Sequence, residues 1–301
     1  MKIESKPKII IIVGPTAVGK SDLAVQIAKK FNGEIISADS RQVYKDMNLG
    51  TGKITKKEML GIPHYLLDVV SPIRSNFNVK KFQQKAYKKI DEILKKNKTP
   101  IIVGGTGFYI QSIVDGIVLP EIKLNPDFRK KLEKLSLVEL QKKLAKADPD
   151  RFTNIDIKNK VRLIRALEIV SEFGSVPKYE KNPKYNPIQI GLKLDQEKLK
   201  EKIVIRLDKR LKKGMLAEAK KLHKSGLSWK KMESFGLEYK FMALYLQNKI
   251  SLEEMKNEII NKSCQYAKRQ ITWFKKDQRI KWFSPKDQPS NTLRKIISDF
   301  L

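Results

Sequence analysis

One segment near the start of the chain constrains the fold more than any other. Residues 8–13 (KIIIIV) are a largely β-branched apolar run, typical of a buried parallel strand, which stops at Gly14. The next eight residues, GPTAVGKS (14–21), match G-x-x-x-x-G-K-[ST] at every fixed position. Residues 19–30 then show the apolar spacing of a helix. A strand, a glycine-rich loop and a helix in this order predict a P-loop that binds a di- or triphosphate.

Each residue type in this loop suits a phosphate ligand. The glycines let backbone amides close around phosphate oxygens, and the N-terminus of the following helix adds a favourable field. Lys20 supplies a point charge, and Ser21 a hydroxyl that can bind Mg²⁺. Kinases, NTP-driven machines and transferases with a diphosphate leaving group all use such a loop. The residues predicted to bind the diphosphate or nucleotide are Gly14, Pro15, Thr16, Ala17, Val18, Gly19, Lys20 and Ser21.

The rest of the chain divides into three regions. Strands expected at 34–38 and 100–103, with a helix at 79–96 between them, indicate an α/β layer. After residue 115 the sequence is mostly helix-forming, until a strand at 188–194 returns to the sheet. Amphipathic helices follow, at 196–224, 236–247, 251–276 and 288–300. We predict an α/β fold with a P-loop NTPase-like parallel sheet core (1–114), a mostly helical insertion (115–194) and a helical C-terminal part that packs back on the core (195–301).

Composition narrows the classes of partner and compartment. The longest apolar stretch near the start is far shorter than a membrane span, and no signal-peptide segment follows the basic N-terminus, so we expect a cytoplasmic protein without membrane contact. One cysteine and two histidines disfavour disulfides and structural zinc. The net charge of +30 suits a nucleic acid, but lysines make up most of it. A compositional lysine excess and an RNA partner therefore both stay open.

Asp39 is the second candidate for chemistry. It follows the strand expected at 34–38 and opens the segment Asp39-Ser40-Arg41-Gln42-Val43-Tyr44. Ligands of parallel sheets bind at the carboxyl ends of the strands, where Asp39 would lie. From its position alone, the residue can equally be an Asx turn that ends the strand.

The loop and the Asp39 segment together resemble the bacterial tRNA dimethylallyltransferases, also called tRNA isopentenyltransferases. Further blocks agree in order and spacing, and the resemblance extends from residue 9 to about residue 283. These blocks are GTGK (50–53), PHYLLD (63–68), VGGTGFY (103–109), RLIRALE (162–168) and YAKRQITWF (266–274).

The resemblance implies an activity. The family transfers a dimethylallyl group from its diphosphate to the exocyclic amine of the adenosine 3′ of the anticodon. Mg²⁺ is the implied cofactor, the tRNA anticodon stem-loop and dimethylallyl diphosphate are the implied partners, and we expect a monomer. Asp39 is the implied general base, with Thr16, Lys20 and Thr106 as the other catalytic residues. The implied tRNA-binding residues are Asp39, Ser40, Arg41, Gln42, Thr106, Arg129, Arg162, Arg165, Lys268 and Arg269.

Two departures from the family pattern remove basic groups. Cys264 stands where the family often has an arginine, and residues 233–239 (ESFGLEY) replace a block that is commonly Arg-x-x-Gly-Tyr-Lys-Glu. We expect Trp273 and Phe274 to lie in the core, and His64 to make a structural hydrogen bond. Two alternatives stay open: a P-loop small-molecule kinase, and a non-catalytic RNA-binding relative.

Overall fold

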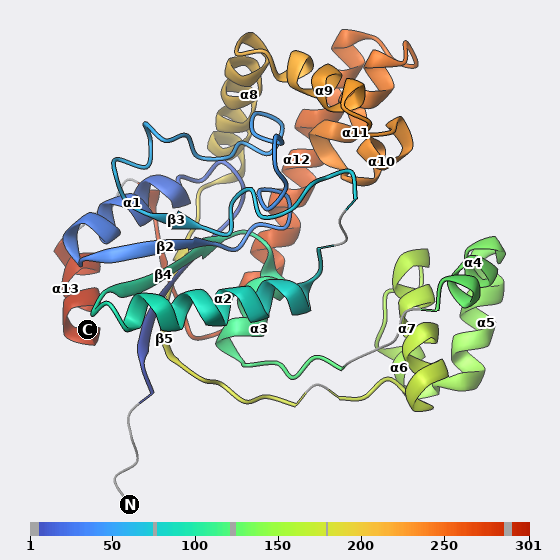
Figure 1. The fold of residues 1–301 in the computed structure, drawn as a ribbon, viewed down its shortest axis with the longest axis horizontal. Coiled ribbons are helices and arrows are strands. Elements are labelled where there is room, and N and C mark those ends of the chain that lie inside the picture. Colours follow the sequence, from blue (N-terminus) through green and yellow to red (C-terminus); the bar gives the residue numbers. More distant parts are fainter. Residues whose placement is uncertain (1–5, 75–76, 121–124, 179, 286–290) are drawn as a thin grey trace, which may run out of the picture. The chain divides into compact units, whose positions relative to one another are not determined.

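A six-stranded parallel sheet forms the centre of the larger of two compact units (Figure 1). The computed structural model describes residues 6–74, 77–120, 125–178, 180–285 and 291–301. The sheet order is β3-β2-β4-β1-β5-β6, and every neighbouring pair is parallel. The strands are β1 (Lys8–Val13), β2 (Gly33–Ser37), β3 (His64–Tyr65), β4 (Thr99–Gly104), β5 (Asn186–Leu192) and β6 (Ile280–Phe283). The predicted fold class, a P-loop-like α/β protein with a parallel sheet, is confirmed.

Helices cover both faces of this sheet, because the side chains of a strand alternate between them. Ile10 and Ile12 pack in one hydrophobic cluster with helices α1, α8 and α13, while Ile9 and Ile11 pack in another with α2, α3 and the helices from α9 to α12. The helices of this unit are α1 (Lys20–Lys30), α2 (Val79–Leu94), α3 (Gly107–Val114), α8 (Gln196–Lys212), α9 (Met215–Lys224), α10 (Trp229–Ser234), α11 (Leu237–Leu246), α12 (Leu252–Phe274) and α13 (Asn291–Phe300).

Residues 117–182 form a second compact unit with its own core. Its helices are α4 (Pro126–Lys134), α5 (Leu137–Ala147), α6 (Pro149–Thr153) and α7 (Lys160–Phe173). The fully buried side chains of Leu140, Leu144 and Leu163 hold α5 against α7. The insertion therefore ends at Asn182 rather than at residue 194, because β5 pairs with β1 over its whole length and belongs to the sheet.

Two further expectations need correction. The helix expected over 196–224 is two helices, α8 and α9, separated at Gly214, whose φ of +94° lies in the left-handed region that only glycine adopts readily. The strands β3 and β6 were not expected from the sequence, because they have two and four residues and are too short to show an alternating pattern. Among the described residues, no helix is long and apolar enough to cross a membrane.

Candidate active site

The phosphate-binding loop connects β1 to α1 at the carboxyl edge of the sheet. Gly14 and Gly19 have φ angles of +147° and +99°, and Ala17 also adopts a left-handed conformation at +62°. A Cβ on Gly14 would lie 2.6 Å from the carbonyl oxygen of Leu192, so this position admits only glycine. Val18 is fully buried, and only the backbone of that residue can face a ligand. A loop of this shape, placed before a helix N-terminus, can bind an anion.

Lys20 begins α1, and its ammonium lies against the phosphate loop. Its Nζ donates a hydrogen bond to the carbonyl oxygen of Pro15, 2.7 Å away. The pKa of Lys20 is lowered to about 8, mainly because burial disfavours the charged ammonium; the nearby Arg206 guanidinium also lowers this pKa, and the Asp39 carboxylate partly offsets both effects. The cation is therefore desolvated and close to a second cation, an arrangement that an added diphosphate would relieve.

Asp39 lies beyond the end of β2, beside the loop. Its Oδ1 accepts hydrogen bonds from the backbone amides of Arg41 (2.7 Å) and Gln42 (3.2 Å), so the Asx-turn interpretation of this residue is correct for its local structure. The Asp39 carboxylate also contributes to the pKa of Lys20 and, after burial as the main cause, to the pKa of Tyr266, which rises to about 12. Asp39 therefore has both properties: its side chain forms an Asx turn, and it lies close to the phosphate loop.

Thr106, in the segment that follows β4, lies beside the Asp39 segment. It is the residue before α3, and its Oγ1 accepts a hydrogen bond from the backbone amide of Ser40 at 3.0 Å. The segments that follow β2 and β4 are joined by this bond, since these strands are neighbours in the sheet. Asp39, Thr106 and the loop after β1 therefore meet at one edge, as the parallel topology requires.

Gln270, on α12, joins the loop to the segment after β4. Its Oε1 accepts a hydrogen bond from the amide of Thr16 at 2.8 Å, and its Nε2 donates to the carbonyl oxygen of Gly105 at 2.9 Å. The side chain is buried and 6% exposed, so both bonds are shielded from water. Because the Thr16 amide is held by Gln270, this amide is directed at a protein acceptor rather than at a ligand.

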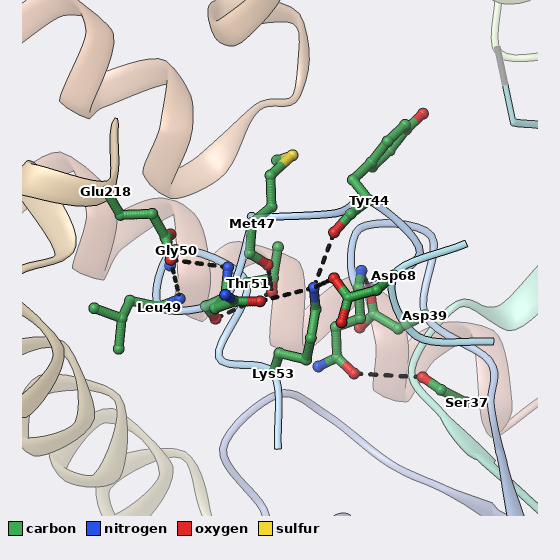
Figure 2. A network of polar contacts seen from close by, with 12 residues as sticks. Ser37, Asp39, Tyr44, Met47, Leu49, Gly50, Thr51, Lys53, Asp68 and Glu218 are labelled. Atoms are coloured by element: carbon green, nitrogen blue, oxygen red, sulfur yellow. Dashed lines mark hydrogen bonds and ion pairs between the residues drawn. The ribbon is translucent and has the colours of Figure 1, made fainter. Parts of the chain in front are cut away.

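A polar network fixes the turn that follows the Asp39 segment, at residues 48–53 (Figure 2). Lys53 donates to the carbonyl oxygen of Tyr44, to Oδ1 of Asn48 and to the carboxylate of Asp68. Lys53 and Asp68 each end one of the family blocks, GTGK and PHYLLD. The structure shows what these blocks have in common: an ion pair that joins the turn to the segment after β3.

Two of the three arginines expected to bind tRNA in the second unit contact one buried carboxylate. Glu168 of α7, whose side chain is 6% exposed, accepts hydrogen bonds from Arg129 and Arg165, each at 3.0 Å. Arg162 is more exposed and lies 3.9 Å from Asp156. Glu168 therefore fixes two of these guanidiniums. In the other unit, Lys268 and Arg269 are exposed on α12, and Ser40, Arg41 and Gln42 are partly exposed around Asp39.

Four further residues singled out in the sequence can be located in the structure. Phe274 is buried as expected, but Trp273 is 40% exposed, because its indole lies over Gly107 at the start of α3 instead of in the core. The ring of His64 makes a hydrogen bond through Nδ1 with the carbonyl oxygen of Ile62, at 2.8 Å. Cys264 is partly buried in the cluster that contains Ala17.

Sequence reasoning missed Arg206 and Gln270. Arg206 lies on α8, far along the chain from the loop, and no local pattern marks it; the only available signal was that this chain uses few arginines among its many cations. Gln270 lies inside the block YAKRQITWF, in which the basic and aromatic residues indicated RNA contacts or core packing and the glutamine indicated neither. Both side chains act through contacts over more than 150 residues of sequence, with Gly52 and with Thr16.

A parallel sheet, a glycine-rich loop at its edge and a carboxylate beside the loop define a P-loop enzyme that acts on a phosphorylated substrate. The family model described as IPP transferase matches residues 42–277. A tRNA dimethylallyltransferase of Caldanaerobacter subterraneus is 42% identical, covering 98% of this chain and 97% of its own, and one of Carboxydothermus hydrogenoformans is 41% identical, covering 97% of each. The chain belongs to the IPP transferase family.

Solved structures agree with this assignment. The full-length tRNA isopentenylpyrophosphate transferase of Bacillus halodurans matches with a TM-score of 0.75 and 37% identity, over 98% of this chain and 97% of its own. A eukaryotic dimethylallyltransferase solved in snapshots of its action on tRNA matches with a TM-score of 0.83 and 29% identity, over 97% of this chain and 79% of its own. The resemblance and the enzyme class predicted from the sequence are confirmed, and neither the kinase nor the non-catalytic alternative receives support.

Proposed function

We propose that this protein transfers a dimethylallyl group from dimethylallyl diphosphate to the exocyclic amine of the adenosine 3′ of the anticodon in tRNA, and releases diphosphate. One observation carries the proposal. Asp39, a proton acceptor, lies at the same sheet edge as the phosphate loop and close enough to Lys20 to influence the pKa of its ammonium. A diphosphate held by the loop would therefore place its allylic carbon near a base.

The diphosphate end of the site stabilises the leaving group. As the allylic C–O bond breaks, its electron pair stays on the diphosphate, where negative charge increases. Lys20 and Arg206 oppose this charge, as do the free amides at the N-terminus of α1. These groups are fixed before the reaction, so they need little reorganisation. Losing one such donor typically costs about 10²–10³ in rate.

Asp39 accepts the proton that the amine loses. The nitrogen of the adenosine forms its bond to the allylic carbon, and one of its two hydrogens leaves as a proton. The backbone amides of Arg41 and Gln42 hold Oδ1 of Asp39, which fixes the carboxylate plane. We assign Oδ2 as the accepting atom. We assign Thr16, in the phosphate loop, and Thr106, beside Asp39, to orienting the two substrates.

Magnesium fits this site only as a partner of the diphosphate. No group of three or more His, Cys, Asp or Glu side chains that could hold a metal lies within the described part of the chain. Ser21, exposed at the start of α1, offers a hydroxyl ligand, and Mg²⁺ commonly takes its remaining ligands from phosphate and water. When bound, the ion would neutralise charge on the departing diphosphate.

The RNA contacts follow from the exposed basic and polar groups. Ser40, Arg41 and Gln42 flank Asp39 and are assigned to the nucleotides next to the target. Lys268 and Arg269 are assigned to the same anticodon loop. The insertion residues Arg129, Arg162 and Arg165 are assigned to phosphates of the anticodon stem, since a guanidinium gives forked hydrogen bonds to phosphate. We expect the enzyme to act as a cytoplasmic monomer.

Incubation with labelled dimethylallyl diphosphate and unmodified tRNA tests the proposal. We expect label in the tRNA, on the adenosine 3′ of the anticodon, and release of diphosphate. The control is a tRNA with a uridine at that position, which should take no label. ATP consumption with a small acceptor would favour the kinase, and tRNA binding without transfer of label would favour the binding protein.

A further inference from the structure

Backbone hydrogen bonds close the turn at residues 48–53, and two of its positions admit only glycine. The amide of Gly52 donates to the carbonyl oxygen of Leu49 (3.1 Å), and the amide of Lys53 donates to that of Asn48 (2.9 Å). Gly50 is buried, and a Cβ there would overlap the ring of Tyr239. Gly52 has a φ of +60°, and a Cβ there would overlap the Arg206 guanidinium. The turn is therefore one rigid piece, packed closely against α8 and α11.

Glu218 of α9 holds the outer side of this turn (Figure 2). Its carboxylate accepts hydrogen bonds from three consecutive amides, those of Asn48 (2.9 Å), Leu49 (2.8 Å) and Gly50 (2.9 Å). Successive backbone amides aimed at one anion form a nest, which binds carboxylates as it binds phosphates. The hydroxyl of Tyr239 donates a fourth bond, at 2.6 Å to Oε1. All four partners are donors, so the site requires an acceptor-only group such as a carboxylate.

The inner side of the turn reaches the phosphate loop through one carbonyl group. The oxygen of Gly52 accepts a hydrogen bond from Nη2 of Arg206 at 3.1 Å. Arg206 also lies close enough to Lys20 for its guanidinium to lower the pKa of the ammonium, so the two cations belong to one electrostatic site. The carbonyl of Gly52 is thus a fixed acceptor that determines where one of the two cations lies.

We propose that Glu218 is a positioning residue for the diphosphate: it anchors the turn at 48–53, whose Gly52 carbonyl orients Arg206 toward the phosphate loop. This inference rests on the proposed function, since it assigns a role in binding the same diphosphate. It also gives the GTGK block a purpose, because Gly50 and Gly52 allow the turn to lie between Glu218 and Arg206. Glu218 itself acts only through the turn.

The test is a double-mutant cycle of Glu218→Gln and Arg206→Gln, read out by the Kd of dimethylallyl diphosphate. Glutamine keeps the size of the side chain but turns an NH₂ group toward amide donors. We expect Glu218→Gln alone to weaken diphosphate binding about tenfold and to leave the Kd of tRNA within about twofold. In the Arg206→Gln background the same change should have no further effect, because the group that it misplaces is already absent.

Two further variants separate positioning from general stability. Glu233→Gln is the matched control: Glu233 is a partly buried glutamate of α10 whose carboxylate accepts a hydrogen bond from Gln247, and its variant should bind diphosphate normally. Tyr239→Phe keeps the ring and removes one bond to Glu218. It should weaken binding about threefold, again only while Arg206 is present, and it serves as the probe if Glu218→Gln fails to fold.

The outcomes distinguish this inference from the function beneath it. If the wild-type protein neither binds dimethylallyl diphosphate nor transfers the label, the proposed function is wrong. If the wild-type protein binds dimethylallyl diphosphate, two results would refute the positioning role of Glu218. In the first, Glu218→Gln (or Tyr239→Phe in its place) leaves the Kd unchanged; in the second, it raises the Kd by the same factor with and without Arg206. Loss of diphosphate affinity that depends on Arg206, with tRNA affinity retained, supports it.

Discussion

The pH dependence of diphosphate use should report the titration of Lys20. The Lys20 side chain must carry its proton to bind a diphosphate, and in the free enzyme its pKa is about 8 instead of the usual 10.5. Below pH 8 the binding form predominates, and above it the amine becomes neutral. The protonated fraction falls from about 91% at pH 7 to about 9% at pH 9, so kcat/KM for dimethylallyl diphosphate should fall roughly tenfold over this range.

Arg206 gives this prediction a specific signature. Its guanidinium is the second cause of the low pKa of Lys20, after burial. In Arg206→Gln, kcat/KM should be lower at pH 7, because one cation is lost, but its decline should begin at a higher pH. Arg294→Gln, on α13, is the control and should keep the wild-type profile.

The assay is initial-rate transfer of label between pH 7 and pH 9, at saturating tRNA and low dimethylallyl diphosphate. A wild-type profile that stays flat to pH 9 would mean that Lys20 titrates near its usual value or does not hold the diphosphate. An unchanged decline in Arg206→Gln would mean that the two cations do not share one site.

Three other results are expected. Gln270→Ala removes the partner of the Thr16 amide and of the Gly105 carbonyl, so the free energy of unfolding measured in urea should fall by about 2–4 kcal/mol. A fall below about 0.5 kcal/mol would contradict a structural role for these two hydrogen bonds. Arg162→Gln should raise the KM of tRNA and flatten its salt dependence without changing kcat, and an equal effect of Lys295→Gln would indicate diffuse attraction instead. Burial raises the pKa of Glu34, but hydrogen bonds from lysines and a tyrosine outweigh it and lower the pKa below 4.5; stability should therefore drop as pH falls below 4.5, and Glu34→Gln should flatten this dependence.

The fold could be predicted from the sequence where short-range pattern and topology agree. The apolar run at 8–13, the glycines of the loop and the helix after it define β1, the loop and α1 to within a residue. The position of Asp39 followed from a general property of parallel sheets. The helix break at Gly214 was missed because apolar spacing continues through it, while a single left-handed glycine ends α8.

The part of the site that could not be predicted depends on contacts between distant segments. Nothing in the local sequence of α8 or α9 indicates that Arg206 contacts the carbonyl of Gly52, or that Glu218 accepts three amides from the same turn. Glu238, in one of the blocks that departs from the family pattern, forms an ion pair with Arg210 at 2.9 Å. A carboxylate that pairs with an arginine of α8 therefore stands where the family pattern commonly has a lysine.

The most direct test of the central claim is transfer by Asp39→Ala under single-turnover conditions, with enzyme in excess over labelled dimethylallyl diphosphate and unmodified tRNA. We expect label transfer to slow by at least about 10²-fold, in the range of general acid–base catalysis, while the Kd of tRNA stays within about twofold of the wild-type value. Transfer at a near wild-type rate in this variant would contradict the assignment of Asp39 as the base beside the phosphate loop.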